Sequence, residues 1–189
     1  MKLVLQNSIL GGGKRQWALK PVDIAVALKL AVLPEGEKFT YAILAELLHL
    51  SASEAHAAVT RLVTARLAVD HGDPRWIRPV NSTLVGLLIY GVPYVFPAVR
   101  GGLTIGVPTA YAVPPLRQQV LFSDQNPPVW PHPEGTVRGL SLLPLHANLP
   151  LAVAKDQKFY ELLALVDALR IGQAREREVA ANHLRERLK

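Results

Sequence analysis

The chain contains residue types that are used in catalytic and metal sites, but it lacks the spacings that such sites need. Its six histidines form neither an HExxH motif nor a pair with metal-ligand spacing. Ser51 and Ser141 lie outside the Gly-x-Ser-x-Gly elbow of a hydrolase nucleophile. No acidic motif links Asp124, Glu134 and Asp167. Because there is no cysteine, thiolate sites are excluded. We therefore do not expect an enzyme, and we expect no metal and no cofactor.

A glycine-rich segment, RGGLTIGVPT at residues 100–109, invites comparison with phosphate-binding loops. It lacks the Gly-Lys-Ser/Thr ending of a P-loop, and its glycines do not have the GxGxxG spacing of dinucleotide-binding folds. The alternatives are turn chemistry and a nucleotide cradle, and we favour turns.

One face of a predicted helix carries side chains suited to reading DNA. Ser51 and Glu54 have the spacing of a capping box, so a helix is expected to begin at Ala52. Its core face repeats apolar residues with helical spacing: Ala55, Val59, Leu62 and Val63. Its outer face carries small and hydrogen-bonding side chains: Ser53, Glu54, His56, Ala57, Thr60 and Arg61. Such side chains allow close approach to base edges in the major groove of DNA.

Two further helices are predicted to position this one. Pro21 suits a first helical position, and an apolar helical stripe follows it within residues 20–33. After a turn, Thr40 can cap a second helix that ends near His49. The third helix then begins after only a short connection, which is the arrangement of a helix-turn-helix.

A β-hairpin is predicted directly after the third helix. Residues 67–69 and 76–78 flank a polar tip at residues 70–75. Three helices followed by a hairpin form a winged helix, whose third helix enters the major groove while the wing contacts phosphates or the minor groove. Arg75 and Arg78 would supply those wing contacts.

The segment from Thr40 to Val69, TYAILAELLHLSASEAHAAVTRLVTARLAV, resembles the helix-turn-helix of MarR-like bacterial winged-helix regulators. It matches four parts of that family's usual frame: Leu44-Ala45, Leu50-Ser51, Ser53-Glu54 and Arg61-Leu62. The family's glycine before the final leucine is missing, because Arg66 precedes Leu67. That glycine commonly adopts a left-handed conformation, which costs a larger residue more. The resemblance implies sequence-selective binding to double-stranded DNA by a transcriptional regulator, specifically a repressor.

The charge of the chain suits a polyanionic partner. Its net charge is +6 and its isoelectric point is near 9.8. Residues 1–33 hold five lysines or arginines against Asp23 alone. A solvated tail and an edge strand are the alternative interpretations of the part of this segment that holds Lys14 and Arg15. We expect DNA contacts from the basic leader, the third helix and the hairpin: Lys14, Arg15, Ser53, His56, Ala57, Thr60, Arg61, Arg66, Arg75 and Arg78.

The second half of the chain is expected to supply assembly or partner binding. A helix from Asn81 would end at Gly91, and a mixed module rich in proline and glycine follows it. Two helices divided at Gly172 are predicted over residues 156–189. The first carries an apolar stripe wide enough to pack against both the chain's own central module and the helical pair of a second subunit: Phe159, Leu162, Val166 and Leu169. We expect a homodimer, since regulators that read palindromic sites commonly need two symmetric copies.

Polar residues interrupt the otherwise apolar helix over residues 160–170. Asp167 and Arg170 are spaced to pair along one face, and Arg175 or Arg177 could join Asp167 from the next helix. An internal link between the two helices and a contact with a partner both remain open.

A fainter resemblance favours a second function. An N-terminal winged helix joined to a compact module with aromatic, glycine and threonine residues, here Tyr94 to Thr109, is similar to the architecture of AbiEi-type antitoxins. This resemblance implies autorepression of an operon and opposition to a nucleotidyltransferase toxin, with the region after residue 81 facing the toxin protein. It assigns no particular contact residue.

We predict an α+β protein with four parts. These are a basic leader at 1–19, a winged helix-turn-helix at 20–80, a mixed α/β module at 81–155 and a C-terminal helical pair at 156–189. The longest apolar runs are far shorter than the roughly 20 residues that cross a bilayer, so no membrane partner is expected. No export signal is visible, and we expect a cytoplasmic protein.

Overall fold

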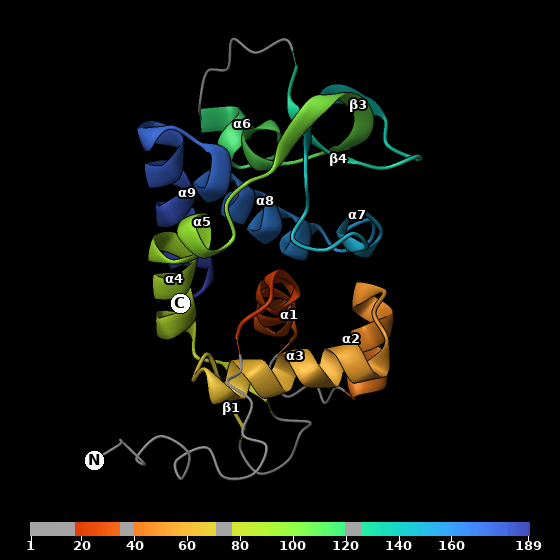
Figure 1. Ribbon diagram of the computed structural model, residues 1–189. Coiled ribbons are helices and arrows are strands. Elements are labelled where there is room, and N and C mark those ends of the chain that lie inside the picture. The colour runs from red at the N-terminus through yellow and green to blue at the C-terminus, as the bar shows by residue number, and fades with distance from the viewer. Residues whose placement is uncertain (1–17, 35–39, 71–76, 120–125) are drawn as a thin grey trace, which may run out of the picture.

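The computed structural model describes residues 18–34, 40–70, 77–119 and 126–189. Over these ranges the protein is a mixed α+β structure. Helix α1 (Pro21–Val32) packs against α3 (Ala52–Thr64) on one side and α8 (Gln157–Ile171) on the other (Figure 1). Among the described helices, none has both the length and the apolar character needed to cross a membrane.

Helix α1 is buried almost all round. Every residue from Asp23 to Leu30 is buried, so this segment is covered on all its faces rather than on the single stripe predicted from the sequence. Its two charged side chains are both paired. Asp23 binds Arg61 of α3, and Lys29 binds Asp156 at the start of α8. Helix α1 therefore links the two halves of the protein.

The predicted starts of the next two helices are confirmed. At the start of α2 (Tyr41–Leu48), the Ile43 N–H donates to Thr40 Oγ1 at 3.2 Å. At the start of α3, the Glu54 N–H donates to Ser51 Oγ at 3.2 Å and the Ser51 N–H donates to the Glu54 carboxylate at 2.9 Å. These bonds satisfy backbone donors that a first helical turn leaves without partners.

Both helices end in a left-handed residue that is not glycine. His49 has a φ of 52° and Arg66 a φ of 59°. After α3, the Arg66 N–H donates to the Val63 carbonyl at 3.0 Å and the Leu67 N–H donates to the Leu62 carbonyl at 2.9 Å. This is the Schellman pattern. Arg66 thus adopts the conformation that glycine usually takes there, and the turn forms without glycine.

A short antiparallel ladder follows α3. Strand β1 (Ala68–Val69) pairs with β2 (Arg78–Pro79), with Val69 opposite Arg78. A hairpin was predicted at this place. Most of its expected polar tip lies outside the described residues, which leave out 71–76.

The chain after residue 80 forms helices around a small sheet. The predicted helix that ends at Gly91 and the division of the last two helices at Gly172 are confirmed. The elements up to the sheet's first strand are α4 (Asn81–Tyr90), α5 (Val92–Val95) and β3 (Arg100–Pro108). The others are a 3₁₀ turn (Ala110–Ala112), α6 (Leu116–Gln119), β4 (Pro128–Pro131), β5 (Val137–Leu142), α7 (Leu149–Ala152) and α9 (Ala174–Arg187), with α8 before α9.

The three-stranded sheet closes on itself. Strand β3 is antiparallel to both β4 and β5, and β4 runs parallel to β5. Closure requires glycine, because a Cβ on Gly139 would lie 1.9 Å from the Pro127 carbonyl oxygen. The glycine-rich segment at 100–109 mostly forms strand β3, so the prediction of turns there was wrong.

One hydrophobic core joins the helices of the first 80 residues to α8 and α9. The α8 stripe belongs to this core, with every member at most 2% exposed: Phe159, Leu162, Val166 and Leu169. The sequence predicted that this stripe would also bind a second subunit. Because its own chain covers it, the stripe is not available to a partner.

The carboxylate of Asp167 ties the sheet to α8. Its Oδ2 accepts hydrogen bonds from Trp130 Nε1 at 2.6 Å and Thr109 Oγ1 at 2.8 Å, while Oδ1 accepts one from Arg170 Nη1 at 2.6 Å. Burial raises the pKa of Asp167, and the charge of Arg170 opposes that rise. The predicted pairing of Asp167 with Arg170 is confirmed, but it lies within α8 and joins α8 to the sheet rather than to α9. The arginines in the first turn of α9 are exposed and take no part in it.

Candidate nucleic-acid interface

The outer face of α3 is open, while its inner face packs against α1 and α2. The inner-face residues are at most 1% exposed: Ala55, Ala58, Val59 and Leu62. On the outer face Ser53 and His56 are exposed, and Ala57 and Thr60 are half-buried. Spacings of three and four residues place these four side chains together, as the sequence predicted.

Glu54 places a negative charge at the start of this face. Its exposed carboxylate accepts hydrogen bonds from the Ser51 hydroxyl at 2.7 Å and the Ser51 N–H at 2.9 Å. These hydrogen bonds lower the pKa of Glu54, so the side chain is ionised at neutral pH. An ionised carboxylate here repels phosphates but can accept a hydrogen bond from a cytosine amino group.

The hydroxyl protons of two threonines are used within α3. Thr60 Oγ1 donates to the His56 carbonyl at 2.9 Å, and Thr64 Oγ1 donates to the Thr60 carbonyl at 2.8 Å. A hydroxyl has one proton to donate but two acceptor lone pairs. Thr60 therefore offers a ligand an acceptor oxygen and a methyl group rather than a donor.

Helix α2 supports one edge of the outer face. The His56 ring lies edge-on to the Tyr41 ring, with their centroids 4.8 Å apart and an interplanar angle of 79°. Burial and the charge of Asp70 raise the pKa of Tyr41, so its hydroxyl is protonated at neutral pH. The contact orients the imidazole at this edge.

Arg61 points inward, contrary to the prediction that it contacts DNA. Its Nε donates to Asp23 Oδ2 at 2.7 Å, its Nη2 donates to Oδ1 at 2.5 Å, and the residue is 7% exposed. The hydrogen bonds to Asp23 raise the pKa of Arg61. The expected outward position is therefore wrong, because Arg61 compensates a carboxylate that α1 buries. Sequence spacing could not show this, since Asp23 lies on a different helix.

Two predicted phosphate-contacting residues lie after α3. Arg66 is exposed in the turn that ends the helix. Arg78 is half-buried on β2, and its Nη1 donates to the Ile77 carbonyl at 3.1 Å. The other predicted basic contacts lie outside the described residues: Lys14, Arg15 and Arg75.

A hollow of about 290 Å³ lies along α3 and has Lys20, Ala57 and His146 in its lining. It joins α3 to the loop between β5 and α7. In that loop, Asn148 Nδ2 donates to the His49 carbonyl in the turn between α2 and α3. The sequence analysis did not predict Lys20 or His146 as site residues. The basic character of the first 33 residues was a signal for Lys20, but no local pattern indicated His146.

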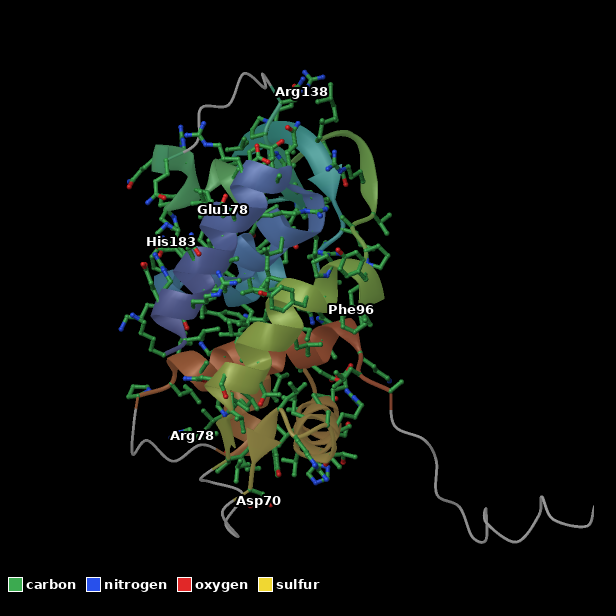
Figure 2. All side chains as sticks on the ribbon, turned by 90° about the vertical axis from the view of Figure 1, so that its left-hand side faces the viewer. Asp70, Arg78, Phe96, Arg138, Glu178 and His183 are labelled. Carbon is green, nitrogen blue, oxygen red and sulfur yellow. The ribbon has the colours of Figure 1, made fainter. Side chains whose placement is uncertain are left out.

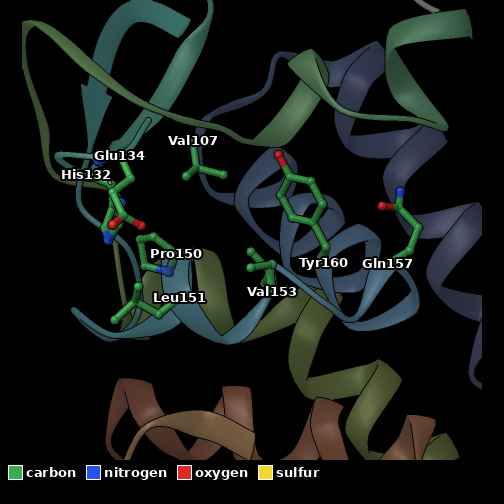
Figure 3. Close-up of a pocket in the computed structure, with 9 residues that line it drawn as sticks. Val107, His132, Glu134, Pro150, Leu151, Val153, Gln157 and Tyr160 are labelled. Atoms are coloured by element: carbon green, nitrogen blue, oxygen red, sulfur yellow. Dashed lines mark hydrogen bonds between the residues drawn. The ribbon is translucent and has the colours of Figure 1, made fainter. Parts of the chain in front are cut away.

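A second cavity, of about 260 Å³, lies between the sheet and helices α7 and α8. Figure 3 shows His132 and Glu134 on one side of it and Tyr160 on the other. The Tyr160 hydroxyl donates to the Pro108 carbonyl at 2.6 Å, and burial raises the pKa of Tyr160 to about 12. Its proton is therefore retained at neutral pH. Across the described ranges, no group of three or more histidine or acidic side chains is placed to hold a metal ion.

Comparisons with protein-family models, curated proteins and solved structures find no match to this chain. The case for a binding site on α3 therefore rests on the geometry of the helix alone. Its distinguishing features are an open polar face, a hollow along the helix and a short ladder after its end.

Proposed function

We propose that the protein is a sequence-selective, double-stranded DNA-binding transcriptional regulator that acts as a repressor. On this proposal, α1 to α3 and the β1–β2 ladder form a winged helix-turn-helix. One observation carries it: the outer face of α3 is open and bears small polar side chains, while the rest of the helix is anchored in the core. A helix about 10–12 Å across fits a major groove about 12 Å wide.

The outer face of α3 would read base edges. The acceptor oxygen of Thr60 suits an amino group of adenine or cytosine, and its methyl group suits the methyl of thymine. The His56 ring and the Ser53 hydroxyl lie on the same face. Losing one matched base pair typically costs about 1–3 kcal/mol, so a few such contacts are enough for selectivity.

The residues after α3 would bind the phosphate backbone. Arg66 is exposed there, and Arg78 lies on the adjoining ladder. Phosphate contacts hold a protein in register without reading sequence. Each neutralised phosphate releases counterions, so binding should weaken as salt concentration rises.

Selection from a randomised duplex library, followed by binding measurements over a salt series, tests the proposal. We expect one sequence to be enriched, and log K to fall linearly with log salt concentration. Thr60→Ala should change the preference among sequences, whereas Arg66→Gln should weaken binding to all of them. Arg117→Gln is the matched control, because Arg117 is exposed on α6 far from α3 (Figure 1).

Two outcomes would count against this function. Folded protein that binds no duplex at low salt would falsify DNA binding. An equal loss of affinity for all sequences on replacing Thr60 or His56 would remove the reading role of α3.

A specific observation favours a second candidate function, an antitoxin that represses its own operon and opposes a nucleotidyltransferase-type toxin. The sheet exposes apolar side chains, with Leu103 50% exposed, Ile105 47% and Leu140 43%. Leu103 lies opposite Leu140 in the β3–β5 pairing, so the exposed groups adjoin. If a neighbouring gene encodes such a toxin, the two purified proteins should form a complex that Leu103→Asp weakens and Arg117→Gln does not.

A further inference from the structure

Two tyrosines and a valine lie exposed where α4 meets α5. Tyr90 is 71% exposed, Tyr94 76% and Val95 58%. Figure 2 faces this surface and shows α9 beside α4 and α5. A cavity of about 220 Å³ between these helices has Tyr90 and Tyr94 in its lining. Single exposed apolar residues are ordinary on protein surfaces, but a contiguous aromatic group beside a cavity is typical of a protein interface.

Charged residues of both signs line the same cavity. Arg177, Glu178 and Arg185 come from α9. Among the described residues none of the three has an ion-pair partner, although Arg185 donates hydrogen bonds to Asn182 Oδ1 at 2.9 Å and to the Tyr90 hydroxyl at 3.3 Å. Opposite charges therefore line one cavity, and the described part of the chain offers them no ionic partner.

We propose that this surface, the α4–α9 face (Tyr90, Tyr94, Val95, Arg177, Glu178 and Arg185), is a two-fold interface with a second copy of the chain. In a two-fold interface the same patch meets itself, so the patch must be complementary to itself. A face that carries both an acid and arginines meets this condition, since Glu178 of one copy can pair with Arg177 or Arg185 of the other. Tyrosine and arginine are also the residue types that most often dominate binding energy.

A second exposed apolar surface, on β3 and β5, does not meet this condition. On β3 and β5 the exposed charges that flank Leu103 and Leu140 are Arg100 and Arg138, and both are positive. Pairing of that surface with itself would place like charges together. It therefore serves as the matched control face.

The position of the α4–α9 face relative to α3 suits a palindromic DNA site, and this step rests on the proposed function. Figure 2 shows Arg78 and Asp70 below the face, at the end of the molecule that carries α3. A two-fold axis that runs along the face, from the sheet toward α3, puts α3 of both copies at the same end. Two copies of α3 can then meet two half-sites on one side of a duplex.

Sedimentation velocity of the full chain without DNA tests the assembly. We expect a dimer at micromolar concentration, with the dissociation constant raised about tenfold or more by Tyr94→Ala. Leu103→Ala on the control face should leave it unchanged. Glu178→Arg and Arg185→Glu should each weaken the dimer, because each brings like charges together across the axis. The double variant carries both signs again, so it should recover much of the wild-type affinity.

A wild-type chain that is monomeric at micromolar concentration overturns the proposal. A dimer that Leu103→Ala weakens and Tyr94→Ala does not overturns it as well, and so does failure of the double charge variant to recover affinity. Circular dichroism of each variant shows whether it is folded. The double charge variant tests the interface independently of that control, because an unfolded chain would not recover dimer affinity. Because assembly is measured without DNA, a dimer that binds no duplex supports this interface and contradicts only the proposed function.

Discussion

At the scale of single residues, Arg66 couples the stability of the fold to the proposed binding of DNA. Its φ of 59° lies in the left-handed region, which costs a residue with a side chain roughly 1–2 kcal/mol. Glycine avoids that cost but loses about 0.5–1 kcal/mol more chain entropy on folding. An exposed arginine here therefore costs some stability while placing a cation directly after α3.

Arg66→Gly should raise the free energy of unfolding by roughly 0.5–1 kcal/mol, because relief of backbone strain exceeds the added entropy cost. The same variant should weaken duplex binding and lower the slope of log K against log salt by about one. Arg66→Lys is the control, since it keeps both the charge and the strain. Urea unfolding and fluorescence anisotropy measure the two effects. A variant less stable than wild type would contradict the assignment of strain, and an unchanged slope would contradict the phosphate contact.

Arg61 should act on stability directly, because it neutralises the fully buried Asp23. Arg61→Met should lower the free energy of unfolding by about 3–5 kcal/mol, since it leaves a buried carboxylate without its cation. The double variant Asp23→Leu, Arg61→Met removes both charges and should regain most of that loss. Chemical unfolding of the wild type, the single variant and the double variant measures these free energies. Unchanged stability in Arg61→Met, with a loss of DNA affinity alone, would restore Arg61 to the interface.

At the scale of elements, the sequence predicted those features of helices and strands that depend on hydrogen bonds between neighbouring residues. The start of α3 was predictable because Ser51 and Glu54 bond to each other across one turn. The closed sheet was not predictable from the sequence. Its close approach of Gly139 to the Pro127 carbonyl, and the order in which its strands pair, both depend on segments that are far apart in the chain. The full burial of α1 also escaped prediction, because a short apolar helix has the same pattern whether one face or every face is covered.

The start of α8 contains a contact that depends on pH. Asp156 Oδ1 accepts from the Phe159 N–H at 3.0 Å, and Oδ2 accepts from Lys29 Nζ at 2.6 Å. Burial alone would raise the pKa of Asp156, but the hydrogen bonds from Lys29 and Phe159 outweigh it and hold the pKa below its ordinary 3.8. The unfolded chain therefore binds the proton more readily than the folded one. The stability from Asp156 is present above about pH 4 and is lost as pH falls through the folded pKa.

Asp156→Asn should flatten the dependence of stability on pH. The amide oxygen can still cap α8, but the residue no longer titrates, so the free energy of unfolding should fall less steeply below about pH 4 than in wild type. At pH 7 the variant should be less stable, because Lys29 is almost buried and loses its carboxylate. Lys29→Met should also reduce the slope. Urea unfolding at a series of pH values measures the stability of each chain and its dependence on pH. If wild type, Asp156→Asn and Lys29→Met lose stability equally steeply below about pH 4, this contact is excluded as a source of acid sensitivity.

At the scale of the whole molecule, the sequence predicted the outer face of α3 better than the surroundings of that face. Four outer-face positions of α3 were predicted because helical spacing alone brings them together. The hollow along α3 was not predicted, because one of its lining residues, His146, belongs to the distant loop that follows β5. The burial of the α8 stripe depends on α1 packing against α8, which no local pattern indicates. The domain boundaries predicted from the sequence thus separate segments that share one hydrophobic core.

That shared core predicts that the first 155 residues do not fold on their own. Removing α8 and α9 would uncover the side of α1 that packs on α8, and it would leave Lys29 without Asp156. A chain ending at residue 155 should therefore lose the sharp transition of the full chain in chemical unfolding, and its near-UV circular dichroism should fade. Full-length Tyr94→Ala is the control, because it should lose assembly while keeping the fold. If the shortened chain unfolds as sharply as the full chain, then α1 to α3 form a core of their own and α8 merely covers it.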